Sequence, residues 1–149
     1  MYLEVPVSRI QLALNVANIE ESIEFYSKLF STLPHKRRDG YANFVIEEPN
    51  LKLVLIENAA EAGTLNHLGV EVDTTDEVHA AAGHLAATGL DTTEELNTVC
   101  CYARQDKIWV EDPAGLPWEV YTVTDDSPQR TAASTTCCTD EGLLTIGGS

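Results

Sequence analysis

Adjacent cysteines are the most chemically distinctive feature of this 149-residue sequence. Its four cysteines form two neighbouring pairs, Cys100-Cys101 and Cys137-Cys138. Neighbouring side chains of a regular strand point to opposite faces, so two adjacent thiols converge on one atom only at a bulge, a turn or a strand end. Thiolates favour soft, thiophilic species over the hard cations that carboxylates prefer. We interpret Cys100 and Cys101 as a capture site for such a species; packing as small apolar groups is the alternative.

Composition narrows the classes of protein that this site can serve. The chain carries 24 acidic and 9 basic residues, for a net charge of −15, which excludes nucleic acid as a partner. The only basic cluster, residues 36–38, is interpreted as a solvated turn. No apolar run is long enough to cross a membrane, and the N-terminus lacks the features of a signal peptide. We expect a cytoplasmic protein with no membrane partner, in which disulfides do not form.

Two stretches of the sequence repeat one pattern. Residues 10–30 and 66–89 each contain an apolar strand, an acidic turn and an amphipathic helix, and an ungapped alignment sets Gln11 on His67. Strand-like segments follow each helix, at 41–47 and 51–57 in the first half and at 100–103, 107–112 and 117–123 in the second. Each half is therefore predicted to be a strand, a helix and then about three strands, which is a βαβββ module.

These modules predict an α+β fold. Joining them into one curved mixed sheet, with the helices outside, is the economical way to bury both halves. The predicted domain covers residues 9–124, with modules at about 9–58 and 66–124, after an N-terminal extension at 1–8. Residues 125–149, which contain Cys137 and Cys138, are expected to be a disordered tail. The inner face of the sheet would form a pocket of approximate two-fold symmetry, with Gln11 and His67 opposite one another.

The paired modules and the closing pattern DPAGLPWEVY (112–121) resemble the vicinal oxygen chelate superfamily, which includes glyoxalases and extradiol dioxygenases. The resemblance implies a divalent metal bound by Gln11, His67 and Glu119. A gapped alignment sets Leu53 at the fourth symmetric position, and leucine cannot coordinate a metal, so open positions would remain. The alternative is that His67 and Gln11 are hydrogen-bonded inner residues without a metal. Three further histidines are expected at the surface: His35, His79 and His84.

A narrower resemblance rests on TVCCY (98–102), NHLGVEV (66–72), FYSKLF (25–30), QDKIWV (105–110) and PWEVYTV (117–123). Together they are similar to the organoarsenical carbon–arsenic lyases, a branch that includes cadmium-inducible proteins. The resemblance implies an Fe(II)-dependent dioxygenase that uses O2 to release inorganic arsenite from trivalent methyl- or arylarsenicals. Cys100 and Cys101 would bind the arsenical, and Tyr102 would line the pocket or be an edge-strand aromatic.

Two other classes of function stay open at this point. One is a non-catalytic protein whose thiols sequester Cd(II) or As(III). The other is a different enzyme of the superfamily, such as a glyoxalase-like isomerase or a thiol transferase acting on fosfomycin. Cys137 and Cys138 would either scavenge arsenic or be incidental.

Overall fold

The computed structural model describes residues 8–128, which form two successive modules. The first module contains β1 (Arg9–Val16), α1 (Ile19–Phe30), β2 (Lys36–Arg38), β3 (Tyr41–Ile46) and β4 (Leu51–Glu57). A short 3-10 helix, η1 (Ala59–Glu61), leads to the second. The second module contains β5 (Leu65–Glu71), α2 (Thr75–Ala87), β6 (Thr93–Cys100), β7 (Ala103–Glu111) and β8 (Pro117–Asp126). Both modules therefore have the predicted order of elements.

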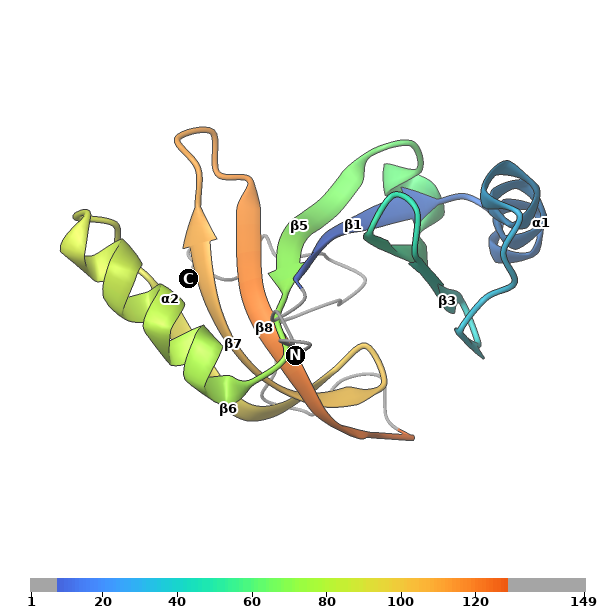
Figure 1. Ribbon diagram of the computed structural model, residues 1–149. Coiled ribbons are helices and arrows are strands. Elements are labelled where there is room, and N and C mark those ends of the chain that lie inside the picture. The colour runs from blue at the N-terminus through green and yellow to red at the C-terminus, as the bar shows by residue number, and fades with distance from the viewer. Residues whose placement is uncertain (1–7, 129–149) are drawn as a thin grey trace.

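All eight strands belong to one mixed sheet with the order β2-β3-β4-β1-β5-β8-β7-β6. The modules join at the centre, where β1 pairs antiparallel with β5, while β1–β4 and β5–β8 are parallel pairs. Figure 1 shows a strongly curved sheet with α1 and α2 at opposite ends of the molecule. The predicted fold class is confirmed. No helix among residues 8–128 is long and apolar enough to cross a membrane.

Polar residues fix where each helix begins. The Asn18 side chain accepts a hydrogen bond from the backbone N–H of Glu21 at 3.0 Å, and Thr74 does the same for Glu77 at 3.1 Å. Acidic side chains fill both first turns, where they oppose the positive end of the helix dipole. These caps set the turn between each first strand and its helix, as the sequence pattern predicts.

The two faces of the sheet carry different apolar clusters. The outer cluster lies between α1 and the strands of the first module and contains Val16, Ile23, Ala42, Phe44, Ile46, Leu51, Leu53 and Leu55. The inner cluster, on the concave face, contains Ala13, Tyr41, Val54, Ile56, Cys100, Tyr102 and Trp109. The candidate site lies on this concave side.

The structure corrects the prediction for Leu53. Its side chain belongs to the outer cluster, so it faces α1 and not the inner face. The strand registers pair Ala13 with Val54, and Gly69 with Glu119, so Val54 occupies the position symmetric to Glu119. The gapped alignment was wrong by one residue, and a slip of one residue moves a strand side chain to the opposite face. Valine, like leucine, cannot coordinate a metal.

Two further predictions about local structure were wrong. Residues 36–38 are not a solvated turn but an edge strand, β2, whose Lys36 side chain reaches the second module. The segment 100–103 is not a strand but a hairpin turn, preceded by the unpredicted strand β6. Residues 93–97 of β6 are mostly exposed and polar, so they lack the apolar alternation by which a strand is recognised from sequence. The three surface histidines lie exposed, as predicted.

Candidate functional site

Three buried polar side chains converge at the centre of the inner face. Gln11 on β1, His67 on β5 and Glu119 on β8 are 4%, 1% and 2% exposed. Gln11 Nε2 lies 3.1 Å from His67 Nε2 and 2.7 Å from Glu119 Oε2. His67 Nε2 lies 2.8 Å from the same Glu119 oxygen. Residues separated by more than fifty positions in the sequence thus form one cluster because β1, β5 and β8 are neighbouring strands.

A row of amides fixes the orientation of His67. Asn66 donates its Nδ2 to Asn15 Oδ1 at 3.1 Å, which leaves Asn66 Oδ1 as the acceptor for His67 Nδ1 at 2.8 Å. In the neutral imidazole the proton is therefore on Nδ1, which leaves Nε2, facing Glu119, open to a second proton or to a metal ion. Two lone-pair atoms 2.8 Å apart repel one another, and a second proton on Nε2 or a metal ion bound by both atoms would replace this repulsion with attraction.

Gln11 is held from the other side by Tyr121. The Tyr121 hydroxyl donates a hydrogen bond to Gln11 Oε1. The two ends of an amide are exchanged by a half-turn about its last bond. That turn would point Oε1 at His67 and Glu119 and give Nε2 to the Tyr121 oxygen, so the side chain can offer a neutral oxygen ligand without losing its support. Burial raises the pKa of Tyr121, with Glu71 and Glu119 acting in the same direction, so the hydroxyl stays protonated.

Lys107 is the charge partner of Glu119. Its Nζ lies 2.8 Å from Glu119 Oε1, and its side chain is 0% exposed. The ammonium also lies 5.3 Å from the centre of the Trp109 ring and 5.8 Å from that of Tyr121. Burial alone would raise the pKa of Glu119, but Lys107, together with His67 when its Nε2 carries the second proton, outweighs burial and holds that pKa far below its ordinary range. Glu119 is therefore a carboxylate, with Oε2 turned to His67 and Gln11.

Gly69 makes room for this cluster. It lies on β5 between Gln11 on β1 and Glu119 on β8. A Cβ at this position would lie 2.8 Å from Glu119 Cγ, 2.9 Å from the Glu119 carbonyl oxygen and 3.4 Å from Gln11 Nε2. The two side chains can approach one another only because residue 69 has no side chain.

The donor set fits a divalent metal. An imidazole nitrogen with its lone pair directed inward, an ionised carboxylate oxygen and an amide oxygen are ligands that non-haem Fe(II) and related ions accept. Residues 8–128 contain no group of three His, Cys, Asp or Glu side chains that could hold a metal ion, so a metal bound here would need Gln11 as its third ligand. The supports of His67 and Gln11 are the outer hydrogen bonds that orient ligands in metal sites.

The hairpin turn between β6 and β7 brings the cysteine pair together. Cys100 pairs with Ala103, and the two residues between them, Cys101 and Tyr102, have φ angles of 52° and 62°. This is the turn geometry that glycine and asparagine normally occupy, so both residues are held in a costly conformation. The result is that the two sulfurs lie on the same side, 3.6 Å apart. The turn that adjacent thiols require for convergence is therefore present.

The oxidation state of this pair differs from the expectation. Cys100 and Cys101 are both disulfide-bonded, although not to one another at 3.6 Å. A disulfide sulfur is not a thiolate, so any capture of a thiophilic species requires prior reduction. The second pair, Cys137 and Cys138, and the other predictions for the tail beyond residue 128 lie outside the described residues.

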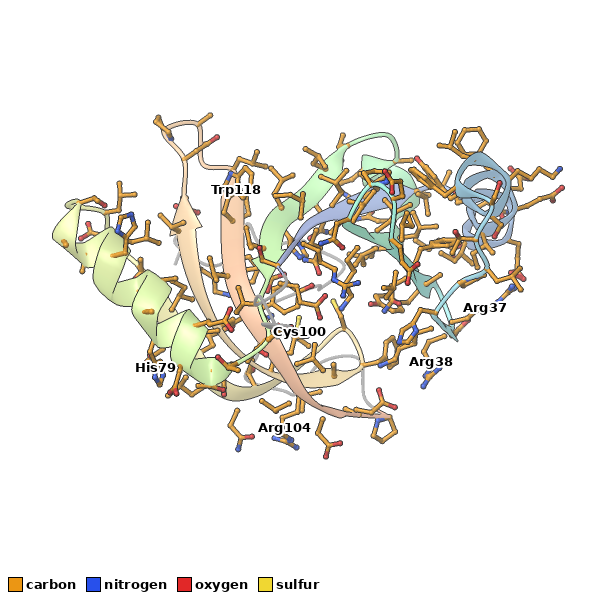
Figure 2. All side chains as sticks on the ribbon, in the orientation of Figure 1. Arg37, Arg38, His79, Cys100, Arg104 and Trp118 are labelled. Atoms are coloured by element: carbon orange, nitrogen blue, oxygen red, sulfur yellow. The ribbon has the colours of Figure 1, made fainter. Side chains whose placement is uncertain are left out.

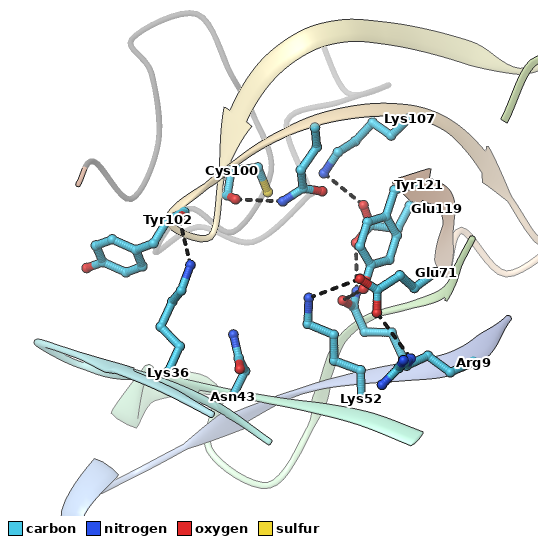
Figure 3. Close-up of polar contacts among 12 residues, drawn as sticks. Arg9, Lys36, Asn43, Lys52, Glu71, Cys100, Tyr102, Lys107, Glu119 and Tyr121 are labelled. Carbon is cyan, nitrogen blue, oxygen red and sulfur yellow. Dashed lines mark hydrogen bonds and ion pairs between the residues drawn. The ribbon is translucent and has the colours of Figure 1, made fainter. Parts of the chain in front are cut away.

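The first module holds this turn in place. Lys36 donates a hydrogen bond to the Tyr102 carbonyl oxygen at 2.8 Å and pairs with Asp126. The Tyr102 ring packs on Tyr41, with 5.1 Å between ring centres, and under the Arg38 guanidinium at 5.7 Å. Tyr102 thus anchors the turn, and Figure 3 shows its ring directed away from Glu119.

The buried cluster of Gln11, His67 and Glu119 and the cysteine turn at residues 100–103 border the same concave region. Cys100 and Trp109 share the inner cluster, and the Trp109 ring lies 5.4 Å from that of His67. Figure 2 shows Cys100 near the middle of the molecule, whereas His79 and Arg104 lie at its outside. In Figure 3, Cys100 and Glu119 face one space from different sides.

Sequence reasoning missed Lys107, Tyr121, Trp109 and Gly69 as parts of this site. A signal existed on β7, where Gln105, Lys107 and Trp109 alternate with outward residues and are 4%, 0% and 2% exposed. A lysine at an inward position between two buried residues needs a charge partner. The partner itself could not be named without the register of β7 on β8.

The fold and the cluster define a class: paired βαβββ modules that gather metal-type ligands on the inside of one curved sheet. Residues 9–120 match the family described as the Glyoxalase/Bleomycin resistance protein/Dioxygenase superfamily. The chain belongs to that superfamily.

Relatives of known name extend over most of the chain. It is 57% identical to the trivalent organoarsenical cleaving enzyme of Thermomonospora curvata over 135 residues, covering 89% of each chain. It is 50% identical to the cadmium-induced protein CadI of Mycobacterium tuberculosis, covering 96% of this chain and 99% of that one. Among solved structures, a variant of homoprotocatechuate 2,3-dioxygenase from Brevibacterium fuscum matches with a TM-score of 0.58 at 21% identity, over 85% of this chain and 34% of the dioxygenase. That likeness concerns the fold.

Proposed function

We propose that the chain is an Fe(II)-dependent dioxygenase that cleaves the carbon–arsenic bond of trivalent organoarsenicals and releases inorganic arsenite. The observation that carries the proposal is the presence of two complementary sites on one concave face. One is a turn with two sulfurs 3.6 Å apart, and the other is the buried cluster of Gln11, His67 and Glu119. The names of relatives that are 57% and 41% identical, both trivalent organoarsenical cleaving enzymes, support the same activity.

The reduced cysteine pair captures the substrate. An organoarsenous acid, R–As(OH)2, exchanges both hydroxyl groups for the sulfurs of Cys100 and Cys101. Two As–S bonds form, two As–O bonds break, and the thiol protons leave with the hydroxyls as two molecules of water. Arsenic stays trivalent and keeps its carbon substituent. Holding it on a fixed turn makes the following step effectively intramolecular.

Iron, when bound, supplies the redox chemistry with O2. His67 offers Nε2, Glu119 offers Oε2 and Gln11 offers its amide oxygen as ligands. Lys107 keeps Glu119 ionised within a water-excluded site. Asn66 and Tyr121 keep the two neutral ligands in position.

The balanced equation of the proposed reaction predicts which products should form and in what ratio. For methylarsenite, CH3As(OH)2 and O2 together equal As(OH)3 and CH2O. The four electrons that O2 accepts come from the methyl carbon, and arsenic remains trivalent. Formaldehyde and arsenite should therefore appear in equal amounts.

The test uses reduced protein loaded with Fe(II) under anaerobic conditions and mixed with methylarsenite before air is admitted. We expect arsenite over many turnovers, with formaldehyde in a one-to-one ratio. The matched control is the His67→Ala variant, which should bind methylarsenite through the cysteines but release no arsenite. A chain truncated after Pro128 should keep turnover; Ser127 must be retained because its N–H donates to the Tyr102 carbonyl oxygen at 3.0 Å.

A second candidate function is sequestration without cleavage. The paired sulfurs favour it, because a dithiolate binds Cd(II) or As(III) without any metal cofactor. Stoichiometric binding of methylarsenite with no release of arsenite from the Fe(II)-loaded, reduced protein would establish this function and reject the lyase.

A further inference from the structure

A pocket with basic walls opens beside the cysteine turn. Its volume is about 300 Å³, and residues of both modules line it, among them Arg9, Lys36, Asn43, Lys52, Glu71 and Cys101. We call it the basic pocket. This volume is at the lower end of the range for small-molecule sites, about 300–1,000 Å³. Three Lys or Arg side chains against one carboxylate are unexpected in a chain of net charge −15.

Two cations of the basic pocket, Arg9 and Lys52, share a single carboxylate, whereas Lys36 pairs with Asp126. Glu71 is shared, with Oε1 3.4 Å from Arg9 Nε and Oε2 3.8 Å from Lys52 Nζ. Both distances exceed the 2.7–2.9 Å or so of a charge-assisted hydrogen bond. Figure 3 shows Lys52 and Arg9 on either side of Glu71, with Lys36 across the space. An anionic oxygen in the pocket would give these cations a closer partner than Glu71 alone provides.

Asn43 adds an unmatched polar group to the same wall. It is 3% exposed, its Nδ2 donates to the Tyr41 hydroxyl oxygen at 2.9 Å, and its Oδ1 is buried with no hydrogen-bond partner. The two ends of the amide are exchanged by a half-turn about its last bond, which would direct Nδ2 away from Tyr41. Asn43 would then have Nδ2 as the donor for an oxygen bound in the pocket.

The substrate class follows from where the pocket lies. We propose that the basic pocket receives the organic group of the arsenical and selects groups that carry an anionic oxygen, such as an aryl carboxylate. The inference rests on the proposed function for one point only: arsenic held by Cys100 and Cys101 keeps one carbon substituent. Since Cys101 lines the same pocket as Lys52 and Arg9, that substituent would enter the space that these cations border.

Binding to reduced, iron-free protein tests this without turnover. The probes are 4-carboxyphenylarsenous acid and its 4-carbamoyl analogue, which have nearly the same shape and differ in charge. Tryptophan fluorescence reports binding, because Trp109 packs in the inner cluster with Cys100. We expect the carboxylate to bind about tenfold more tightly, the effect of one hydrogen bond to a charged group.

Matched variants show which residues produce the preference for the carboxylate probe. Lys52→Met and Arg9→Met should each lower the ratio of the two affinities toward one, and Lys52→Arg should preserve it. The control is Lys28→Met, which removes an exposed lysine of α1 that pairs with Glu24 outside the pocket and should leave the ratio unchanged. Equal affinities in the parent chain, or a preference that survives in both Met variants, would overturn the proposal.

Methylarsenite separates this inference from the proposed function, because its methyl group carries no anionic oxygen for the basic pocket to bind. Arsenite release from methylarsenite by a protein with no preference between the aryl probes would retain the lyase and reject the anionic subsite. A carboxylate preference without any arsenite release would retain the subsite and reject cleavage.

Discussion

Alanine at Gly69 is the most direct perturbation of the candidate metal site. The added Cβ would lie 2.8 Å from Glu119 Cγ and 2.9 Å from the Glu119 carbonyl oxygen, closer than real Cβ contacts. The carbonyl belongs to the paired strand β8 and cannot move without disturbing its register with β5. The side chain of Glu119 must therefore shift, and it takes Oε2 away from His67.

Two magnitudes follow from this contact. Overpacking a well-packed interior costs roughly 1–3 kcal/mol in the free energy of unfolding. For a chain of this length, each kcal/mol lowers the melting temperature by about 2–4 °C. A displaced ligand should also weaken Fe(II) binding by at least the tenfold to hundredfold or so that is lost when outer supports of metal ligands are removed.

Gly83→Ala is the matched control. Gly83 lies within α2, and an added Cβ would have no neighbour within 4 Å. Alanine there should stabilise the protein by about 0.5–1 kcal/mol and leave metal binding unchanged. The assays are urea unfolding of the metal-free proteins and anaerobic Fe(II) titration. A Gly69→Ala variant with the parent's stability and Fe(II) affinity would refute the placement of Glu119 and Gln11 around residue 69.

Three further predictions concern the residues of the two sites. Fe(II) at one hundred times its dissociation constant should add about 2.7 kcal/mol to the free energy of unfolding of the parent. This added stability should vanish in His67→Ala and Glu119→Ala and should be smaller in Gln11→Ala. Unfolding with and without metal measures it. Cys100→Ser and Cys101→Ser should each lose nearly all arsenite release while binding Fe(II) like the parent, and an active single mutant would contradict the dithiolate. Because the pKa of Glu119 is lowered on folding, it stabilises the metal-free protein above the ordinary carboxyl pKa of about 4.3, and this is lost as pH falls below that value. Glu119→Gln should flatten that acid dependence, and an unchanged slope in acid unfolding curves would count against the buried ion pair.

The two modules could be predicted from the sequence because most of their helices and strands are recognisable within a short stretch of residues. Acidic residues after a polar cap mark where α1 and α2 begin, and short apolar segments mark β1, β3, β4 and β5. The same reasoning failed for Leu53. Side-chain direction in a strand depends on register, and a gapped alignment does not fix register to a single residue.

The charge partners were beyond sequence reasoning for a different reason. Lys107 and Glu119 are each ordinary in sequence, and only the pairing of β7 with β8 sets them 2.8 Å apart. Likewise, Lys36 reads as part of a solvated basic run, yet it crosses to the second module and binds the Tyr102 carbonyl oxygen. Long-range pairs of this kind depend on the order of strands in the sheet.

Ligand charge contributes little to the Fe(II) affinity of the proposed metal site, so that affinity must depend more on the geometry of the ligands. Of the three ligands only Glu119 is charged, and Lys107 shares that charge at 2.8 Å. The site therefore lacks the excess of carboxylates by which many divalent-metal sites gain affinity. What remains is preorganisation: Asn66 holds His67, Tyr121 holds Gln11, and the missing side chain of Gly69 lets the ligands meet. One methyl group at residue 69 should accordingly cost this site more Fe(II) affinity than it would cost a site rich in carboxylates.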